Sequence, residues 1–341
     1  SNSAMSYTDF SSYDNEYIDV FLQFNGGISL FFGILGILVV LTKSPHYYTH
    51  YKNFLLNIAF WSLSLDIYTS VFLKPKFLFP ALYFCPTGWL KNDDPNMAAI
   101  WMDIFWILLG AVNIALTSAV VYRYAALKGD LAKVFNCLFL SFLIIVFSTR
   151  ALPVIIFYYL GNTDNIAISR AALTQWPNLR RSLGATGCAG LHNGIAEPFP
   201  HLFNIFIILM FGLIIPFVLY LLLESYSNLR DEKRLMSHEA YRVHQETLFC
   251  LTLQLCIPII AFALPYTFIQ LMIMIGMEKV TMLSQCMVLL TSMHSTANTI
   301  IMVVCIPDYR NGIWQFFSDP LGTLFKCYSA AKNKIHNTIE T

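Results

Sequence analysis

Seven long apolar segments constrain the fold of this 341-residue chain more than any other feature of its sequence. A helix that crosses the roughly 30 Å hydrocarbon core of a bilayer needs about 20 mostly apolar residues. Each segment reaches that length and is flanked by charged or turn residues. We therefore predict an all-α, polytopic membrane protein, a bundle of seven transmembrane helices, with spans at about 19–42, 53–73, 97–122, 134–160, 201–223, 247–275 and 282–306.

The composition agrees with a membrane protein and excludes several soluble classes. Hydrophobic residues make up 57% of the chain and charged residues 12%, whereas soluble domains carry about 25% charged residues. That charge is too little to cover the surface of a soluble particle of this size. The net charge of +1 also gives no basic surface for a polyanion. We expect the lipid bilayer as a partner and no nucleic acid.

Lys and Arg residues are distributed unequally between the two sets of predicted loops. With the amino terminus outside, the inner segments carry thirteen of them and the outer segments seven. Loops on the cytoplasmic side are normally the richer in Lys and Arg. The charge bias thus predicts the amino terminus outside, with an extracellular segment 1–18, a transmembrane bundle 19–306 and a cytoplasmic tail 307–341.

Asp66 lies deep in the predicted second span, about 21 Å of helix rise beyond Lys52. Ionisable groups inside a bilayer are costly, so each one raises a functional question. Asp66 could bond polar groups of the seventh span, such as His294 and Asn298, and act with them as a buried activation switch. The alternative is a structural hydrogen bond that plays no part in signalling.

Three further charged residues lie in or at the ends of spans. Arg123 ends the third span and could lock the inner helix ends together, or serve as an interfacial anchor between tyrosines. Asp103, near the outer end of the same span, could pair with a cationic ligand or lie among lipid headgroups. Arg150, within the fourth span, could bind an acidic ligand or Asp103, or extend outward to the interface. We expect Asp103 and Arg150 to be the ligand-binding residues.

Two prolines interrupt the predicted sixth span. Pro258 and Pro265 each remove a backbone hydrogen bond from the helix, which creates hinges that could swing its inner half outward. Prolines are also common in membrane helices that do not act as hinges. We include both prolines among the predicted activation-switch residues.

Cys85 and Cys188 are the only cysteines among the eight that we expect on the outer, oxidising side. A disulfide between them would tether the loop after the second span to the long outer loop. The alternative is two unpaired thiols. The sequence contains neither a CxxC pair nor a Cys/His cluster with zinc spacing, so we expect no metal site.

Catalytic motifs are not evident in the sequence. It contains no H-E-x-x-H, G-x-S-x-G or phosphate-binding loop, and no carboxylate pair at suitable spacing on a soluble segment. We therefore expect no enzymatic activity and no cofactor.

Four motifs in order resemble those of a known receptor family. The first runs from Lys43–Ser44–Pro45 through Asp66 to Leu78–Phe79–Pro80, and the second is Tyr122–Arg123–Tyr124. The third, at the entry to the sixth span, includes Ile257–Pro258–Ile259. The fourth comprises His294, Ser295 and Asn298, followed by Pro307–Asp308–Tyr309–Arg310. Over about residues 40–312 the chain resembles a nematode serpentine chemoreceptor of the Str superfamily, class H or the related class I.

The resemblance implies a G-protein-coupled chemosensory receptor in the plasma membrane of sensory cilia. Such a receptor would bind an odorant or other small environmental molecule in the outer bundle and signal to a heterotrimeric G protein. Asp308 departs from the Pro–Tyr–Arg pattern of the family and puts normal coupling in doubt. The alternative function is a seven-span ligand-gated channel or transporter, although transporters often show inverted repeats and none is evident here.

Overall fold

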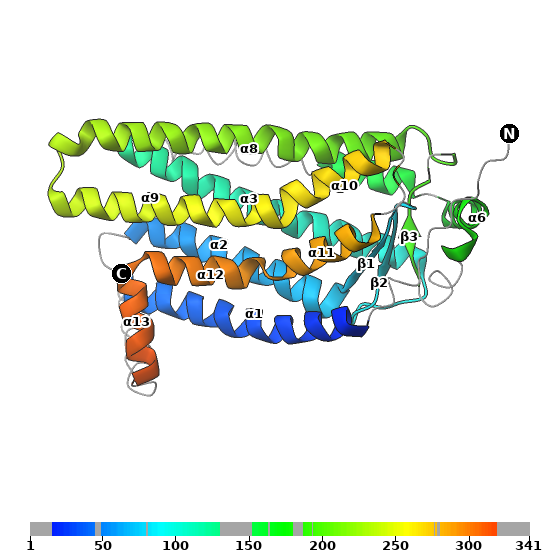
Figure 1. Cartoon of the computed structure of the whole chain (residues 1–341), viewed down its shortest axis with the longest axis horizontal. Helices are drawn as coiled ribbons and strands as arrows, with labels where there is room; N and C mark the ends of the chain where they lie inside the picture. The colour runs from blue at the N-terminus through cyan, green and yellow to red at the C-terminus, as the bar shows by residue number, and fades with distance from the viewer. Residues whose placement is uncertain are drawn as a thin grey trace, which may run out of the picture.

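The computed structural model describes residues 16–44, 49–79, 81–129, 152–162, 164–179, 187–192, 194–275, 277 and 280–318. Its helices run back and forth along one long axis (Figure 1). The helices of this bundle are α1 (Glu16–Lys43), α2 (Thr49–Ile67), α3 (Pro95–Leu127), α8 (Phe199–Asp231), α9 (His238–Pro258), α10 (Leu264–Met274), α11 (Thr281–Ser292) and α12 (His294–Cys305).

Among the described residues, apolar helices occur at the positions of six predicted spans and at the end of the fourth. Five helical segments are long and apolar enough to cross a membrane, and α11 and α12 together form a sixth candidate that is bent by 48°. The shorter Leu152–Gly161 helix is the described end of the predicted fourth span, whose residues 134–151 lie outside the described residues. The five long segments are Tyr17–Lys43, Tyr51–Leu73, Pro95–Leu127, Phe199–Arg234 and His238–Met274.

Two π-helical segments interrupt the regular helices. The segment η3 (Tyr68–Leu73) continues α2, and η6 (Ile259–Ala263) joins α9 to α10. Pro258 is the last residue of α9, and Pro265 is the second residue of α10. The two predicted hinge prolines therefore flank a wide helical turn. Such turns are typical of places where the regular backbone ladder is broken.

Small residues allow α1 to approach its neighbours closely. A Cβ atom on Gly33 would lie 2.5 Å from Leu63 Cδ1 in α2, and one on Gly36 would lie 2.9 Å from Thr299 Cγ2 in α12. Larger side chains would force these helices apart, as expected for membrane helices that associate by packing.

A small antiparallel sheet closes one end of the bundle. Its strands β1 (Pro75–Leu78), β2 (Tyr83–Pro86) and β3 (Ala189–Gly190) pair in the order β1-β2-β3. A disulfide joins Cys85 of β2 to Cys188, with an S–S distance of 2.05 Å. The helix α6 (Asn165–Gln175) and the turn η4 (Pro177–Leu179) share a small buried core with this sheet. We call this end the outer end, following the predicted orientation.

The inner end is built from helical turns and one crossing helix. The turn η5 (Glu232–Arg234) joins α8 to α9. The helix α13 (Pro307–Ser318) follows α12 and leaves the bundle at a steep angle (Figure 1). It forms the start of the predicted cytoplasmic tail.

Candidate functional site

Asp66 lies at the centre of a buried polar layer in the middle of the bundle. Its side chain is 0% exposed, and its Oδ2 accepts hydrogen bonds from Ser29 Oγ at 3.1 Å and from the backbone N–H of Ser295 at 2.8 Å. Ser295 is the second residue of α12, where a helix leaves its first N–H groups without intrahelical partners. The Asp66 carboxyl group therefore caps α12 from another helix, at the break between α11 and α12.

His294 and Asn298 complete the polar layer but do not hold Asp66 as the sequence suggested. Asn298 Nδ2 lies 3.0 Å from His294 Nε2 and 3.3 Å from Ser62 Oγ. Asp66 does bond the seventh span, but the partner there is the Ser295 amide rather than the side chains of His294 and Asn298, and its other partner is the Ser29 hydroxyl. The ring of Phe262 in η6 contacts the His294 ring at 4.8 Å between centroids. This contact links the polar layer to the wide turn between Pro258 and Pro265.

Arg123 forms a second buried site at the inner end of α3. The residue is 5% exposed, which is far less than an anchor in the lipid interface would be. Its guanidinium lies 3.8 Å from the centre of the Tyr51 ring, and Nη1 lies 3.5 Å from His244 Nδ1. Nε and Nη2 have no hydrogen-bond partner among the described residues. Arg123 thus joins α2, α3 and α9 through an aromatic ring and an imidazole.

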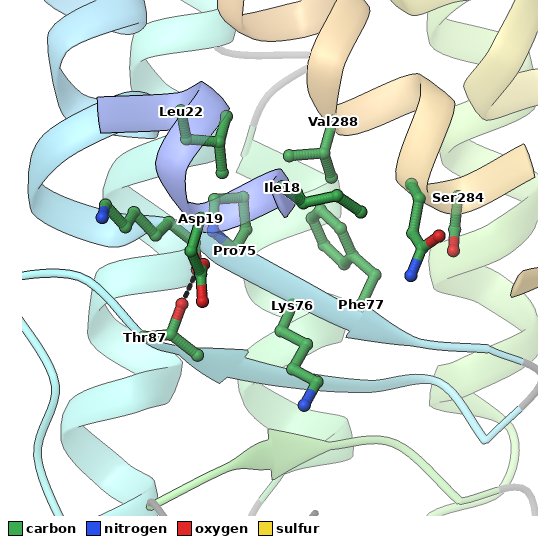
Figure 2. Close-up of a pocket in the computed structure, with 11 residues that line it drawn as sticks. Ile18, Asp19, Leu22, Pro75, Lys76, Phe77, Thr87, Ser284 and Val288 are labelled. Atoms are coloured by element: carbon green, nitrogen blue, oxygen red, sulfur yellow. Dashed lines mark hydrogen bonds between the residues drawn. The ribbon is translucent and has the colours of Figure 1, made fainter. Parts of the chain in front are cut away.

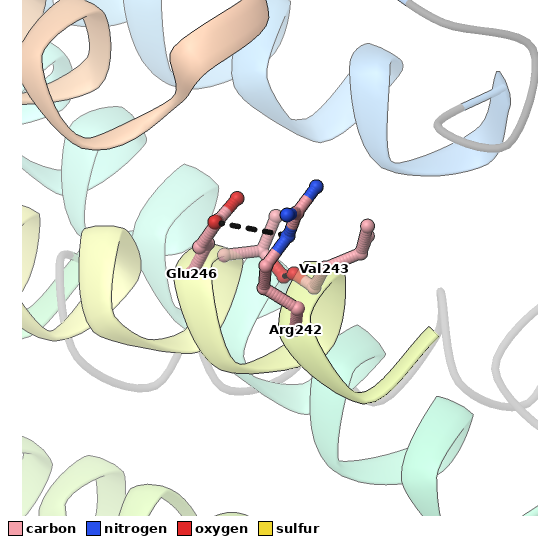
Figure 3. Close-up of polar contacts among 4 residues, drawn as sticks. Arg242, Val243 and Glu246 are labelled. Carbon is pink, nitrogen blue, oxygen red and sulfur yellow. Dashed lines mark hydrogen bonds and ion pairs between the residues drawn. The ribbon is translucent and has the colours of Figure 1, made fainter. Parts of the chain in front are cut away.

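The surroundings of Arg123 are aromatic and closely packed. The Tyr122 ring stacks on Phe54 at 4.7 Å, and Ser44 and Tyr309 share a hydrogen bond of 2.8 Å between their hydroxyls. This second contact connects the end of α1 to α13. On the exposed side of α9, Arg242 forms an ion pair with Glu246 one turn later, with Nε and Oε1 3.6 Å apart (Figure 3). Such an exposed pair contributes little to stability.

An aromatic cluster fills the outer half of the bundle. The Trp106 ring lies 5.9 Å from both Phe203 and Tyr266, so one indole connects α3 to α8 and α10. Phe105 and Phe77 extend the cluster toward the outer sheet, each with its ring 6.5 Å or less from Tyr266. Aromatic pairs at such separations pack favourably. The cluster joins three helices that belong to three different predicted spans.

Several polar atoms around this cluster are buried without a hydrogen-bond partner. Asp103 Oδ1 is one of them, and the described residues include no partner for it. Unpaired buried polar groups are rare and need an explanation. Arg150, the other predicted ligand-binding residue, lies outside the described residues. The other buried atoms of this kind near the cluster are Trp106 Nε1, Tyr158 Oη, Asn204 Oδ1 and Gln270 Oε1.

A cavity of about 120 Å³ opens at the outer end between α1, β1 and α11. Figure 2 shows Phe77 of β1 turned toward Ile18 and Val288 across this cavity. Lys74, immediately before β1, also borders it and has a φ of 41°, a left-handed conformation that is costly for any residue but glycine. Phe77 therefore separates the outer cavity from the aromatic cluster. Among the described residues, no group of three or more His, Cys, Asp or Glu side chains could hold a metal ion.

Sequence reasoning missed the aromatic partners of these sites. Tyr51 is adjacent to Lys52 and looks like an ordinary interfacial tyrosine, and Trp106 and Tyr266 look like core residues of apolar spans. Their roles depend on contacts between helices far apart in sequence.

Comparisons with known proteins agree with this architecture. The crystal structure of squid rhodopsin is similar over 93% of this chain and 88% of that chain, with a TM-score of 0.50 and 13% sequence identity. This likeness shows the fold, a seven-helix receptor bundle, and confirms the predicted fold class. A search of curated proteins finds no match.

The family comparison settles the class that the sequence motifs left open. The model for the serpentine type 7TM GPCR chemoreceptor Srh matches residues 14–319, nearly the whole chain. Class H is therefore favoured over class I, and neither the family nor the fold is that of an enzyme. The chain belongs to the Srh family of serpentine seven-transmembrane chemoreceptors, class H of the nematode Str superfamily.

Proposed function

We propose that this chemosensory receptor binds a small molecule at the aromatic cluster in the outer half of its bundle and, in response, releases Arg123 at the inner end. The released inner end would then engage a heterotrimeric G protein. The observation that carries the proposal is the contact of Arg123 with Tyr51 and His244, which ties three helices together.

The outer site is supported by its unpaired polar atoms and by its access to the outside. Phe77 contacts Tyr266 of the cluster at 6.4 Å and also forms part of the outer cavity wall. A ligand that entered the cavity would therefore meet the Phe77 ring, which contacts Tyr266. Pockets for small molecules are commonly apolar and aromatic, with a few polar groups that fix orientation.

The route from the outer site to Arg123 follows one continuous helical unit. Tyr266 lies in α10, Phe262 in η6 and His244 in α9, and these three elements follow each other in the chain. A movement of Tyr266 would act on η6, whose Phe262 contacts His294 of the polar layer. It would also act on α9, whose His244 contacts Arg123. The proposed coupling therefore passes through packed side chains and one interrupted helix.

The proposed orientation has the sheet and disulfide outside and α13 inside. The Lys and Arg bias and the position of the disulfide at the sheet end support it. Family membership supports a location in the plasma membrane of sensory cilia. A channel or transporter is not favoured, because the chain matches a receptor family over nearly its whole length.

Basal G-protein activation in Tyr51 and Arg123 variants tests this proposal without a known ligand. Tyr51→Ala removes the ring under the guanidinium and is expected to raise basal nucleotide exchange up to about thirtyfold, since a buried cation–π contact is worth up to about 2 kcal/mol. Tyr51→Phe keeps the ring and should stay close to the wild type. Arg123→Ala should abolish the exchange that the receptor stimulates, because in this proposal the released guanidinium itself contacts the G protein.

Surface expression supplies the control for these variants. A tag on the amino terminus should label unpermeabilised cells equally for all of them, which also tests the orientation. If Tyr51→Ala left basal exchange unchanged at equal surface expression, the contact between Tyr51 and Arg123 would not be one that holds the receptor inactive. Labelling only after permeabilisation would contradict the orientation.

A further inference from the structure

We propose that the ligand of this receptor is a small protonated amine, whose ammonium group is bound by Asp103 and whose body packs among Trp106, Phe203 and Tyr266. This inference rests on the proposed function, because it specifies the ligand of the outer site. It starts from the chemical character of the atoms that the structure leaves buried and unpaired.

Acceptors outnumber donors among the unpaired buried atoms of the outer site. Asp103 Oδ1, Asn204 Oδ1 and Gln270 Oε1 can accept hydrogen bonds, whereas Trp106 Nε1 can only donate and the Tyr158 hydroxyl can do either. Of these five residues, all but Asp103 are at most 4% exposed. A ligand that satisfies this set must donate more hydrogen bonds than it accepts. An ammonium group donates up to three and accepts none.

The unpaired residues lie next to one another. Asp103 and Trp106 are three positions apart on α3 and so lie on neighbouring parts of one helix face. Tyr158 interacts electrostatically with Asp103, and its ring lies 5.7 Å from the Phe203 ring. Phe203 in turn contacts Trp106 at 5.9 Å. Asp103 therefore borders the aromatic cluster through both Trp106 and Tyr158.

A cation fits this environment better than a neutral or acidic group. A carboxyl group in a membrane-spanning helix without a partner is costly, and an ammonium ion beside it would remove much of that cost. Aromatic faces also attract cations, and Trp is the strongest of them. The lysines of the outer end, Lys74 and Lys76, border the outer cavity and are not part of the cluster.

The test compares an amine, an alcohol and an acid on each of two carbon skeletons, with the receptor in lipid nanodiscs. Phenethylamine, phenethyl alcohol and phenylacetic acid are tested, together with isoamylamine, isoamyl alcohol and isovaleric acid. Thermal unfolding and G-protein nucleotide exchange are the two measurements. We expect at least one amine to raise the unfolding temperature and change nucleotide exchange at concentrations where its alcohol and acid do neither.

Asp103→Asn is the matching variant, because it keeps the shape and removes the charge. The half-maximal amine concentration should rise about tenfold to a hundredfold, as for other charged hydrogen bonds. Asp93→Asn, which changes an exposed carboxylate of the outer loop, should leave it unchanged. Without any ligand, Asp103→Asn should unfold at the same temperature as the wild type or a higher one, since an unpaired carboxyl group has been removed.

Each other result overturns the amine assignment. A lower unfolding temperature of ligand-free Asp103→Asn would show that Asp103 has a structural partner. A response to the acids alone would move recognition to Lys74 and Lys76 at the outer cavity. If no probe acts while basal exchange still depends on Arg123 and Tyr51, the ligand class is wrong and the proposed receptor mechanism remains supported.

Discussion

Asp66 and Asp103 are two carboxyl groups in one helix bundle, and their surroundings differ sharply. Asp66 is fully buried; its Oδ2 accepts from the Ser29 hydroxyl and the Ser295 amide, whereas its Oδ1 has no hydrogen-bond partner among the described residues. Asp103 is half-buried, and its buried oxygen has no partner among the described residues. A buried carboxylate with donors holds a structure together, whereas one without donors is a cost that only a later partner can offset. The two residues therefore mark a structural middle of the bundle and the outer half in which we propose that the ligand binds.

Removal of the Asp66 side chain should have the largest effect. Asp66→Ala leaves the Ser295 amide at the start of α12 and the Ser29 hydroxyl without their shared acceptor. We expect the free energy of unfolding to fall by about 3 kcal/mol, from the loss of two hydrogen bonds to a buried charged group. Thermal or denaturant unfolding in nanodiscs measures this loss.

Two controls define the role of Asp66. Asp66→Asn keeps an acceptor for the Ser295 amide and should recover part of the stability. Ser64→Ala changes a serine of the same helix whose hydroxyl donates to Phe60 O, and it should be nearly neutral. If Asp66→Ala and Asp103→Asn changed stability equally, the claim that only Asp66 stabilises the fold would be wrong.

Loss of the disulfide should have the next largest effect, and it should act on the outer half. The disulfide links β2 to the long outer loop, and its two cysteines are 103 residues apart in the sequence. Replacement of both Cys85 and Cys188 by Ser removes this link. We expect a loss of about 2 kcal/mol, at the low end for a native disulfide, because the membrane already confines the unfolded chain. Ligand-induced stabilisation should weaken, while basal exchange through Arg123 persists.

Cys286→Ser is the matched control for this variant, since Cys286 is an exposed free cysteine of α11. If basal exchange in the double variant fell to the level of Arg123→Ala, the disulfide at the outer end would also be needed for G-protein activation at the inner end, which contradicts this prediction.

The smallest expected effect concerns His192 in the outer loop. His192 Nδ1 accepts the Gly194 N–H at 3.1 Å, and Nε2 lies 3.1 Å from Gln175 Oε1. Burial lowers the pKa of His192 below its usual value near 6.5. The unfolded chain then binds more protons than the folded one as pH falls below about 6.5, so stability is retained above that pH and declines below it.

A pH series of the unfolding temperature measures this effect. Glutamine does not titrate, so the unfolding temperature of His192→Gln should fall slightly less than that of the wild type between about pH 7 and pH 5. A steeper decline in the variant would contradict the direction of the pKa shift. Hydrogen exchange at the Gly194 amide would place the change in the outer loop.

The sequence was sufficient for the helices and insufficient for their contacts. Span positions follow from apolar length, because every backbone polar group in a bilayer must be satisfied within a helix. The strands β1, β2 and β3 were not predicted, since segments of two to four residues carry too weak a pattern. They form because the Cys85–Cys188 link and the buried core around it hold the outer loops together.

The site residues divide in the same way. Asp66, Arg123 and Asp103 could be singled out because charge inside a span is rare. Their partners could not, since Ser295 becomes available to Asp66 only because α12 begins at His294. The Arg123–Tyr51 contact likewise depends on how α2 packs on α3. Single-residue chemistry is visible in a sequence, whereas geometry between helices requires the fold.

The π-helical segment η6 has a consequence for how a small outer change could reach the inner end. It lies between Pro258, which ends α9, and Leu264, which begins α10. A π turn holds about one residue more than an α turn. Its conversion to an α turn would therefore rotate α10 against α9 by about 100° and move it by about 1.5 Å along the axis. Tyr266 and His244 lie on opposite sides of that segment. A change of one residue in the length of this turn would therefore convert a small displacement at the outer end into a rotation of the helix at the inner end.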